Sequence, residues 1–152
     1  MAAGEFLIID WGATASGYIS DLTRTFAVGQ IDQSLAEVHR VVEEANAAGR
    51  EAVGPGVRCG EVDRAARTVI SSAGYGEFFL HRTGHGIGLE AHEPPYIRDG
   101  ETALLEPGMT FTVEPGIYLA GRGGVRVEDN LVVTEQGSSS LTSTPRELRV
   151  VG

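Results

Sequence analysis

The sequence has no lysine and a single cysteine, and these two absences exclude several kinds of chemistry. All 12 basic residues are arginines. A P-loop, a Schiff-base site and a Ser–Lys catalytic pair each need a lysine and are therefore excluded. With Cys59 alone, the chain has neither an intrachain disulfide nor a cysteine-built zinc site. This cysteine usage is typical of a reducing, cytoplasmic compartment.

Positive charge and long apolar runs are also scarce. The 21 acidic residues outnumber the basic ones and give a formal net charge of −9. Nucleic acids and anionic membranes both attract basic surfaces, so we expect neither as a partner. No apolar run has the length of a membrane-spanning helix, and the first residues lack the basic start of a signal peptide. The hydrophobic share of 41% is enough for the core of one domain of 152 residues.

The spacing of apolar residues predicts a chain that mixes strands and helices. Strands are expected over residues 6–9, 18–28, 110–119 and 125–134, and helices over residues 32–53 and 60–73. The two pairs of strands flank glycine-containing turns and so predict two hairpins, with the helices between them. The histidine- and glycine-rich residues 78–96 predict irregular chain with short strands, and residues 138–152 an edge strand or a tail. Trp11 is expected in the core, and His39 on an exposed helix surface.

Each predicted hairpin places two carboxylates opposite one another. The expected register puts Asp10 opposite Asp21 in the first hairpin and Glu114 opposite Glu128 in the second. Directly opposed like charges are destabilising unless a cation lies between them. Two exposed pairs, or a register shifted by one residue, would explain the pattern equally well. The spacing alone therefore leaves a metal site and a solvated surface as alternatives.

Three histidines lie between the two hairpins in sequence: His81, His85 and His92. Imidazole is a common metal ligand and a proton carrier near neutral pH. Glycines on both sides of His85 allow the backbone to approach a ligand or another strand closely. Three histidines beside four candidate carboxylates favour a catalytic metal site over a purely structural role.

Five segments, in the same order along the chain, resemble the catalytic domain of the pita-bread metallopeptidases, the family of methionine aminopeptidase and the Xaa-Pro peptidases. They are residues 9–12, 18–25, 81–92, 112–116 and 125–129. The sequence His-Glu-Pro-Pro-Tyr at residues 92–96 and the position of Arg126, two residues before Glu128, are similar to the Xaa-Pro branch.

The resemblance implies an α+β pita-bread fold, with a curved antiparallel sheet and the helices outside it. Residues 1–152 would form one partial catalytic domain, truncated at the N-terminus, because the chain begins almost at the first expected ligand. The first hairpin would then lack the helices that cover it. An exposed apolar sheet face would favour association into a homo-oligomer.

The resemblance also implies the ligands of two divalent metals. The five ligands would be Asp10, Asp21, His85, Glu114 and Glu128, with Asp21 and Glu128 bridging both metals. This oxygen-rich set favours Mn²⁺, with Co²⁺, Fe²⁺ or Zn²⁺ as alternatives. The two metals would share a water and lower its pKa, so that a hydroxide attacks a peptide bond preceding proline.

Four residues would then act on the peptide substrate. Glu114 would relay the proton of the attacking water. His81 and His92 would hold the substrate or stabilise the tetrahedral oxyanion. Arg126 would position a carboxylate or carbonyl of the substrate.

Two other kinds of function remain as alternatives. One is a different hydrolase on the same scaffold, such as a methionine aminopeptidase or a creatinase-like amidinohydrolase. The other is a non-catalytic binding module. Creatinase-type members do without the metal ligands and scaffolding relatives have generally lost them, so the full set here counts against a creatinase-like enzyme and against a binding module, and leaves methionine aminopeptidase open. The sequence does not distinguish a dipeptide substrate from a longer one.

Overall fold

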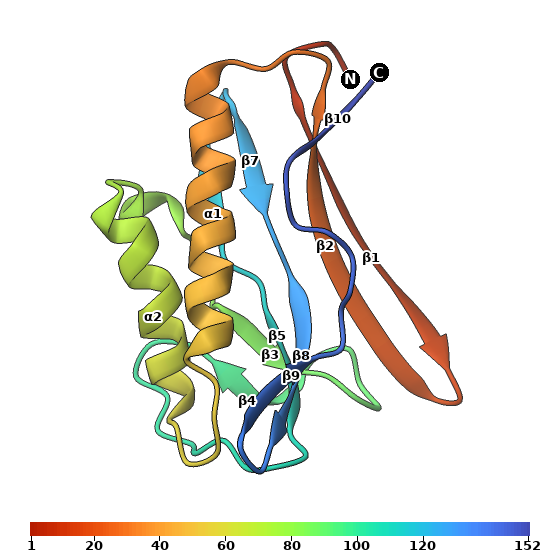
Figure 1. Cartoon of the computed structure of the whole chain (residues 1–152), viewed down its shortest axis with the longest axis vertical. Helices are drawn as coiled ribbons and strands as arrows, with labels where there is room; N and C mark the ends of the chain where they lie inside the picture. Colours follow the sequence, from red (N-terminus) through yellow and green to blue (C-terminus); the bar gives the residue numbers. More distant parts are fainter.

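Two β-rich parts of the chain are separated by a pair of helices. The computed structural model describes all 152 residues. The elements are β1 (Phe6–Ala15), β2 (Tyr18–Val28), α1 (Gln33–Glu51), α2 (Cys59–Ser72), a short 3-10 helix (Gly76–Phe78), β3 (Gly84–Gly86), β4 (Glu93–Ile97), β5 (Thr110–Val113), β6 (Gly116–Leu119), β7 (Gly123–Arg126), β8 (Asp129–Thr134), β9 (Gly137–Ser140) and β10 (Arg149–Val151). Figure 1 shows the helices on one side of the molecule and the β1–β2 hairpin on the other.

The strands form three hydrogen-bonded sheets. Their orders are β1-β2-β10, β4-β3-β5-β8-β9 and β6-β7. All neighbouring strands are antiparallel except β10, which runs parallel to β2. The observed class is therefore α+β with antiparallel sheets, as predicted, and the C-terminal stretch supplies an edge strand.

The register of the first hairpin differs from the prediction by two residues. The chain turns at Ser16 and Gly17, which both have positive φ angles, of 52° and 85°. Two consecutive residues of this kind form the tight turn that best matches the twist of antiparallel strands. Asp10 consequently faces Thr23 instead of Asp21. The predicted opposition is wrong, but the two carboxylates remain diagonal neighbours on one face of the hairpin.

The second hairpin has the predicted register, but each of its strands is interrupted. β5 continues into β6 and β7 into β8 only after a break that contains a glutamate. The N–H of Glu114 donates to the carbonyl of Thr83, and the N–H of Glu128 donates to the carbonyl of Thr23. Pro115 has no N–H to give to the ladder. The two glutamates therefore lie at matching positions where the ladder opens toward other strands.

The helices cover the second hairpin and bury most of the core. Valine and alanine side chains of α1 pack against α2 and against Ile117 and Val125 of β6 and β7. The side chain of Asp32 accepts a hydrogen bond of 2.7 Å from the N–H of Ser34, which confirms it as the N-cap of α1. Neither helix combines the length and the apolar character that a bilayer-spanning segment needs.

The first hairpin has an exposed apolar surface. Trp11 was expected in the core, but its side chain is 42% exposed, and Ile9 on β1 is exposed as well. Both helices lie on the opposite side of the molecule from β1 (Figure 1), so no helix covers this strand. The expected apolar exposure is confirmed, and the expected core position of Trp11 is wrong. Association of copies through this strand stays a prediction.

His39 is buried, although it was expected on the surface. It lies one turn from Leu35 and Val42 on the stripe of α1 that faces the core, and only 2% of it is exposed. Its Nδ1 lies 3.8 Å from the carboxylate of Glu43, and its Nε2 has no partner. Burial, together with the positive charge of Arg24, lowers the pKa of His39 to about 4.

This burial predicts a loss of stability in mild acid. Because the pKa of His39 is lower in the folded chain than its usual value of 6.5, the folded state binds fewer protons. The stability that neutral His39 contributes is present above pH 6.5 and is lost as the pH falls toward 4. From pH 7 to pH 5 the wild type should lose about 2 kcal/mol of unfolding free energy more than His39→Leu. Urea unfolding at both pH values measures the free energy of unfolding of each protein. Equal losses of this free energy in the wild type and in His39→Leu would contradict the burial of His39.

Candidate metal centre

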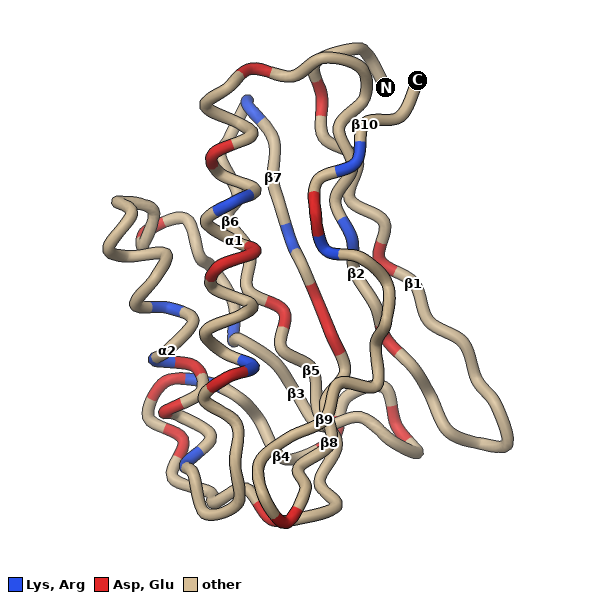
Figure 2. The backbone as a smooth tube through the Cα atoms, in the orientation of Figure 1, with Lys and Arg blue, Asp and Glu red and all other residues tan.

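The five predicted ligands converge at one place, although they come from five separate parts of the fold. Potential ligand atoms within 4.8 Å of one another form three groups: Asp10, Asp21 and Glu128; His85, Glu114 and Glu128; and Asp21, His85 and His92. Glu128 belongs to both carboxylate-rich groups, as a bridging ligand would. Figure 2 shows acidic positions on the β1–β2 hairpin and on the segment between β7 and β8, which runs beside it.

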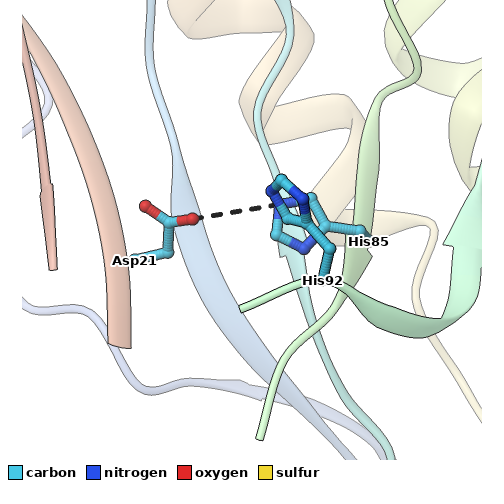
Figure 3. A group of neighbouring side chains, drawn as sticks. All are labelled: Asp21, His85 and His92. Carbon is cyan, nitrogen blue, oxygen red and sulfur yellow. Dashed lines mark ion pairs between the residues drawn. The ribbon is translucent and has the colours of Figure 1, made fainter. Parts of the chain in front are cut away.

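His85 presents one ring nitrogen to the carboxylates. Its Nδ1 donates to the carbonyl of Gly86 at 3.0 Å. Its Nε2 lies 3.2 Å from Oε1 of Glu114 and 3.9 Å from Oδ2 of Asp21. Figure 3 shows Asp21 pointing at His85, with the ring of His92 against that of His85. The Nδ1 contact fixes the tautomer that leaves Nε2 free to bind a cation.

The glycines beside His85 bring its strand close to neighbouring strands. A Cβ at Gly84 would lie 1.8 Å from the carbonyl oxygen of Thr112, and one at Gly86 would lie 2.3 Å from that of Pro94. The predicted close approach is therefore confirmed. It places the imidazole of His85 between β4 and β5, within reach of Glu114.

Glu128 and Asp21 have no arginine partner that would balance their charge, whereas Asp10 pairs with Arg126. Glu128 is 1% exposed; its Oε2 accepts a hydrogen bond of 2.5 Å from the hydroxyl of Thr23, and its Oε1 has no partner. Burial, and then the charge of Glu114, raises the pKa of Glu128 to about 8. Burial, and then the charge of Asp10, raises the pKa of Asp21 to about 6. A buried carboxylate oxygen without a partner beside two other carboxylates fits a bound cation.

A hydrogen-bonded chain of three side chains forms one wall of the site. Nδ1 of His81 donates to the carbonyl of Arg82 at 2.7 Å, so its Nε2 accepts from the hydroxyl of Tyr118 at 2.8 Å. Nη1 of Arg126 donates to the same hydroxyl at 3.1 Å, and Arg126 also pairs with Asp10. Burial lowers the pKa of His81, which keeps this ring neutral. Tyr118 thereby links two of the predicted catalytic residues.

Tyr118 was not among the predicted site residues. A signal for it exists in the sequence, because Gly116 and Gly124 flank it in the hairpin. A Cβ at either glycine would lie within 3 Å of the tyrosine ring or hydroxyl, at 2.6 Å and 2.8 Å respectively. An aromatic residue opposite a glycine of the neighbouring strand indicates a ring that packs over the glycine backbone. Here the nearby turn also accounts for the glycines, so the sequence alone does not reveal this contact.

Tyr118→Phe should destabilise the chain by about 1–3 kcal/mol. The variant keeps the ring but leaves Nε2 of His81 and one Arg126 donor, both partly buried, without their partner, and an unpaired group costs up to about this much. The midpoint of urea unfolding measures the change. Tyr18→Phe is the matched control, because Tyr18 is largely exposed. Equal effects of the two substitutions on the unfolding midpoint would show that the Tyr118 hydroxyl does not stabilise this hydrogen-bonded chain.

The site opens into a cavity of about 460 Å³ that is lined only by polar and charged side chains. Its lining consists of Asp10, Asp21, His81, Arg82, His85, His92, Arg98, Glu114, Arg126 and Glu128. All predicted site residues line it, and Arg82 and Arg98 are additional. Their signal was their position in or beside the histidine-rich residues 78–96, where a basic residue can face an acidic site. The guanidinium of Arg82 lies 5.1 Å from the ring centre of Tyr96.

Known proteins are similar to this chain in both sequence and fold. Metallopeptidase family M24 matches residues 1–135. A Xaa-Pro dipeptidase from Pyrococcus furiosus is 45% identical over 145 residues, which is 95% of this chain and 42% of that protein. A probable dipeptidase PepE from Mycobacterium tuberculosis (strain ATCC 25618 / H37Rv) is 48% identical over 149 residues, covering 97% of this chain and 40% of that protein.

The solved structures agree. Dipeptidase PepE from Mycobacterium ulcerans superposes with a TM-score of 0.97 at 47% identity, covering 99% of this chain and 41% of that one. The prolidase from Pyrococcus furiosus gives 0.92 at 44% identity, with coverages of 94% and 42%. The chain thus spans about two fifths of the length of these relatives. These matches confirm the pita-bread fold, and the chain belongs to metallopeptidase family M24.

Proposed function

We propose that this chain carries the metal-binding and catalytic residues of a peptidase that cleaves the bond before proline. The observation that supports it most is Glu128, a buried glutamate with one free oxygen, shared by two groups of metal-ligand side chains. Relatives in the same family are named Xaa-Pro dipeptidase and prolidase. Residues 1–152 would act as part of one catalytic domain.

Two divalent ions fit the side chains present. Asp10, Asp21 and Glu128 would hold one ion, and His85, Glu114, Asp21 and Glu128 the other. When bound, such a pair polarises the scissile carbonyl and lowers the pKa of a water. One imidazole and four carboxylates form a hard, oxygen-rich set that suits Mn²⁺ better than a soft metal.

The protein side chains then supply the proton transfers. Although burial opposes its charge, the contacts with His85 hold the pKa of Glu114 below its usual value. Glu114 is therefore a carboxylate at neutral pH and can accept a proton from the attacking water. Burial, and then the charge of His85, lowers the pKa of His92. A neutral His92 at the exposed edge of the site can donate its N–H to the developing oxyanion.

Arginines around the cavity would bind the carboxylate of the substrate. Arg126 pairs with Asp10, and Arg82 and Arg98 line the same cavity. A guanidinium matches a carboxylate with two parallel hydrogen bonds. A short peptide would place its C-terminal carboxylate near these arginines when its first peptide bond lies at the ligands. We therefore propose a dipeptide as the preferred substrate.

The test begins with metal uptake. Calorimetric titration with Mn²⁺ should give about two ions per chain, and Asp21→Asn should reduce this number. Glu44→Gln, at an exposed position on α1, is the matched control and should bind as the wild type does. Uptake would then be followed by assays on a Xaa-Pro dipeptide and on a Met-initiated peptide.

Each outcome selects one function. Cleavage of the Xaa-Pro dipeptide supports the proposal, and cleavage of the Met peptide alone would favour the methionine aminopeptidase alternative. A folded chain that takes up no metal would instead favour the non-catalytic module. The cytoplasmic location and the homo-oligomer stay predictions, which fractionation and light scattering would test.

A further inference from the structure

The candidate ligands belong to two parts of the fold, the β1–β2 hairpin and residues 84–134, which the main chain joins at few points. Asp10 and Asp21 lie on β1 and β2, whereas the other ligands lie within residues 84–134. Between β2 and that range, the main chain provides two hydrogen bonds: Ile19 N–H to the Gly88 carbonyl and Glu128 N–H to the Thr23 carbonyl. The relative position of the two ligand sets therefore depends on side chains.

The side chain of Arg24 extends from β2 toward the second ligand set, and all of its N–H donors are used. Its side chain, on β2, is 3% exposed. Nη1 donates to the carbonyls of Thr23 (2.8 Å) and Glu128 (2.5 Å), Nη2 to Oδ1 of Asp129 (2.7 Å) and the carbonyl of Thr144 (2.7 Å), and Nε to the carbonyl of Pro145 (2.8 Å). A guanidinium has five N–H donors, so none is left over.

The partner of Arg24 next to the metal site is itself held from three sides. Asp129, fully buried, follows Glu128 directly and pairs with Arg24 through Oδ1. Its Oδ2 lies 2.6 Å from Nε of Arg146 and 3.6 Å from Nε of Arg50. Arginines from β2, α1 and the C-terminal segment thus share one carboxylate. The backbone of Glu128 is fixed by the same arrangement.

The contacts of Arg24 reach the side chain of Glu128 through one neighbour. The Thr23 carbonyl accepts from both Arg24 and the N–H of Glu128, and the Thr23 hydroxyl donates to Oε2 of Glu128. Moving Arg24 would therefore displace both ends of the Thr23–Glu128 contact. Arg24 itself does not line the cavity.

We propose that Arg24 is a positioning residue for the metal pair, setting the distance between Glu128 and the hairpin carboxylates. This inference rests on the proposed function for the roles of the ligands. A lysine at position 24 keeps the positive charge but has three donors in a different geometry, so it cannot join all five acceptors. Residues that orient metal ligands commonly change metal affinity by about 10–100-fold when replaced.

The experiment compares Arg24→Lys with Arg146→Gln. The second variant also removes an arginine from Asp129, but Arg146 has no contact with Thr23 or Glu128. Arg24→Lys should lower the affinity for the second Mn²⁺ by at least about tenfold. The ion that remains should give the electron paramagnetic resonance spectrum of an isolated Mn²⁺, whereas Arg146→Gln should keep two exchange-coupled ions.

General destabilisation needs its own control. Val42→Ala removes buried apolar contacts in α1, far from the ligands in sequence. It should lower the melting temperature without changing a contact between the two ligand sets. It should keep the coupled metal pair. If Arg24→Lys binds two coupled Mn²⁺ ions with wild-type affinity, or if Val42→Ala loses them equally, the positioning role is wrong.

A metal-free readout separates this inference from the proposed function. In the metal-free chain the N–H of Glu128 should exchange with solvent at least about tenfold faster in Arg24→Lys than in Arg146→Gln, because its acceptor moves. Failure of the wild type to bind metal would refute the proposed function alone. Equal exchange in the two variants would refute the positioning role alone. If Arg24→Lys does not fold, Arg24→Gln, which leaves Asp129 paired with Arg146, takes its place in both measurements, with the same outcomes decisive.

Discussion

Glu128→Gln is expected to abolish the binding of a metal pair. The substitution keeps the size of the side chain and an oxygen for the Thr23 hydroxyl, but it removes the charge that both ligand groups share. Stabilisation by metal ions is worth several kcal/mol in the transition state, so any Xaa-Pro cleavage should fall by at least about 10³-fold. Calorimetric titration with Mn²⁺ and a dipeptide assay measure the two losses.

The same variant should fold at least as well as the wild type without metal. Its uncharged amide avoids the cost of a carboxylate that burial and Glu114 disfavour, as the raised pKa of Glu128 indicates. Loss of metal with retained stability would therefore identify Glu128 as a ligand. Two tightly bound Mn²⁺ ions in Glu128→Gln would refute its bridging role. Glu106→Gln, on an exposed loop, is the control and should change neither property.

Gly84→Ala should destabilise the chain by at least about 3 kcal/mol, the upper part of the range for overpacked sites. The added methyl would lie 1.8 Å from the carbonyl oxygen of Thr112, so β3 and β5 would have to separate. Because His85 follows directly on β3, its ring would move away from Glu114 and metal affinity should fall as well. Thermal unfolding and Mn²⁺ titration measure the two effects.

Gly54→Ala provides the comparison for this substitution. A Cβ at Gly54 would meet only the side chain of Val57, at 3.7 Å, which is ordinary contact. It should change stability by less than about 1 kcal/mol and leave metal binding intact. If Gly84→Ala were as mild as Gly54→Ala, the approach of β3 to β5 would be looser than the structure indicates.

The sequence predicts the site best where local chemistry and geometry agree. The glutamates 114 and 128 were placed opposite each other, and the glycines around His85 were assigned to a close approach of strands; both features are observed. These features depend on short stretches of chain. The turn at residues 120–122 and the missing Cβ atoms are readable from the local sequence alone.

The errors arose where distant segments decide the outcome. The first hairpin turns at Ser16 and Gly17, and a serine with positive φ is not signalled by residue type. His39 is buried because the stripe of α1 that carries it faces the core, and residues far apart in sequence build that core. The breaks beside Glu114 and Glu128 arise because their N–H groups donate to carbonyls outside the hairpin, those of Thr83 and Thr23. Periodicity along one segment contains none of this information.

The division of the ligands between the β1–β2 hairpin and residues 84–134 has a practical consequence for judging any preparation of this chain. Each of these two parts can keep its own hydrogen-bonded ladders while the two shift slightly against each other. Far-ultraviolet circular dichroism reports the ladders and helices, and would look native in such a sample. An assembled site is distinguished from a folded chain with separated ligands only by a measurement that reports a contact between the two parts. The exchange rate of the Glu128 amide is such a measurement.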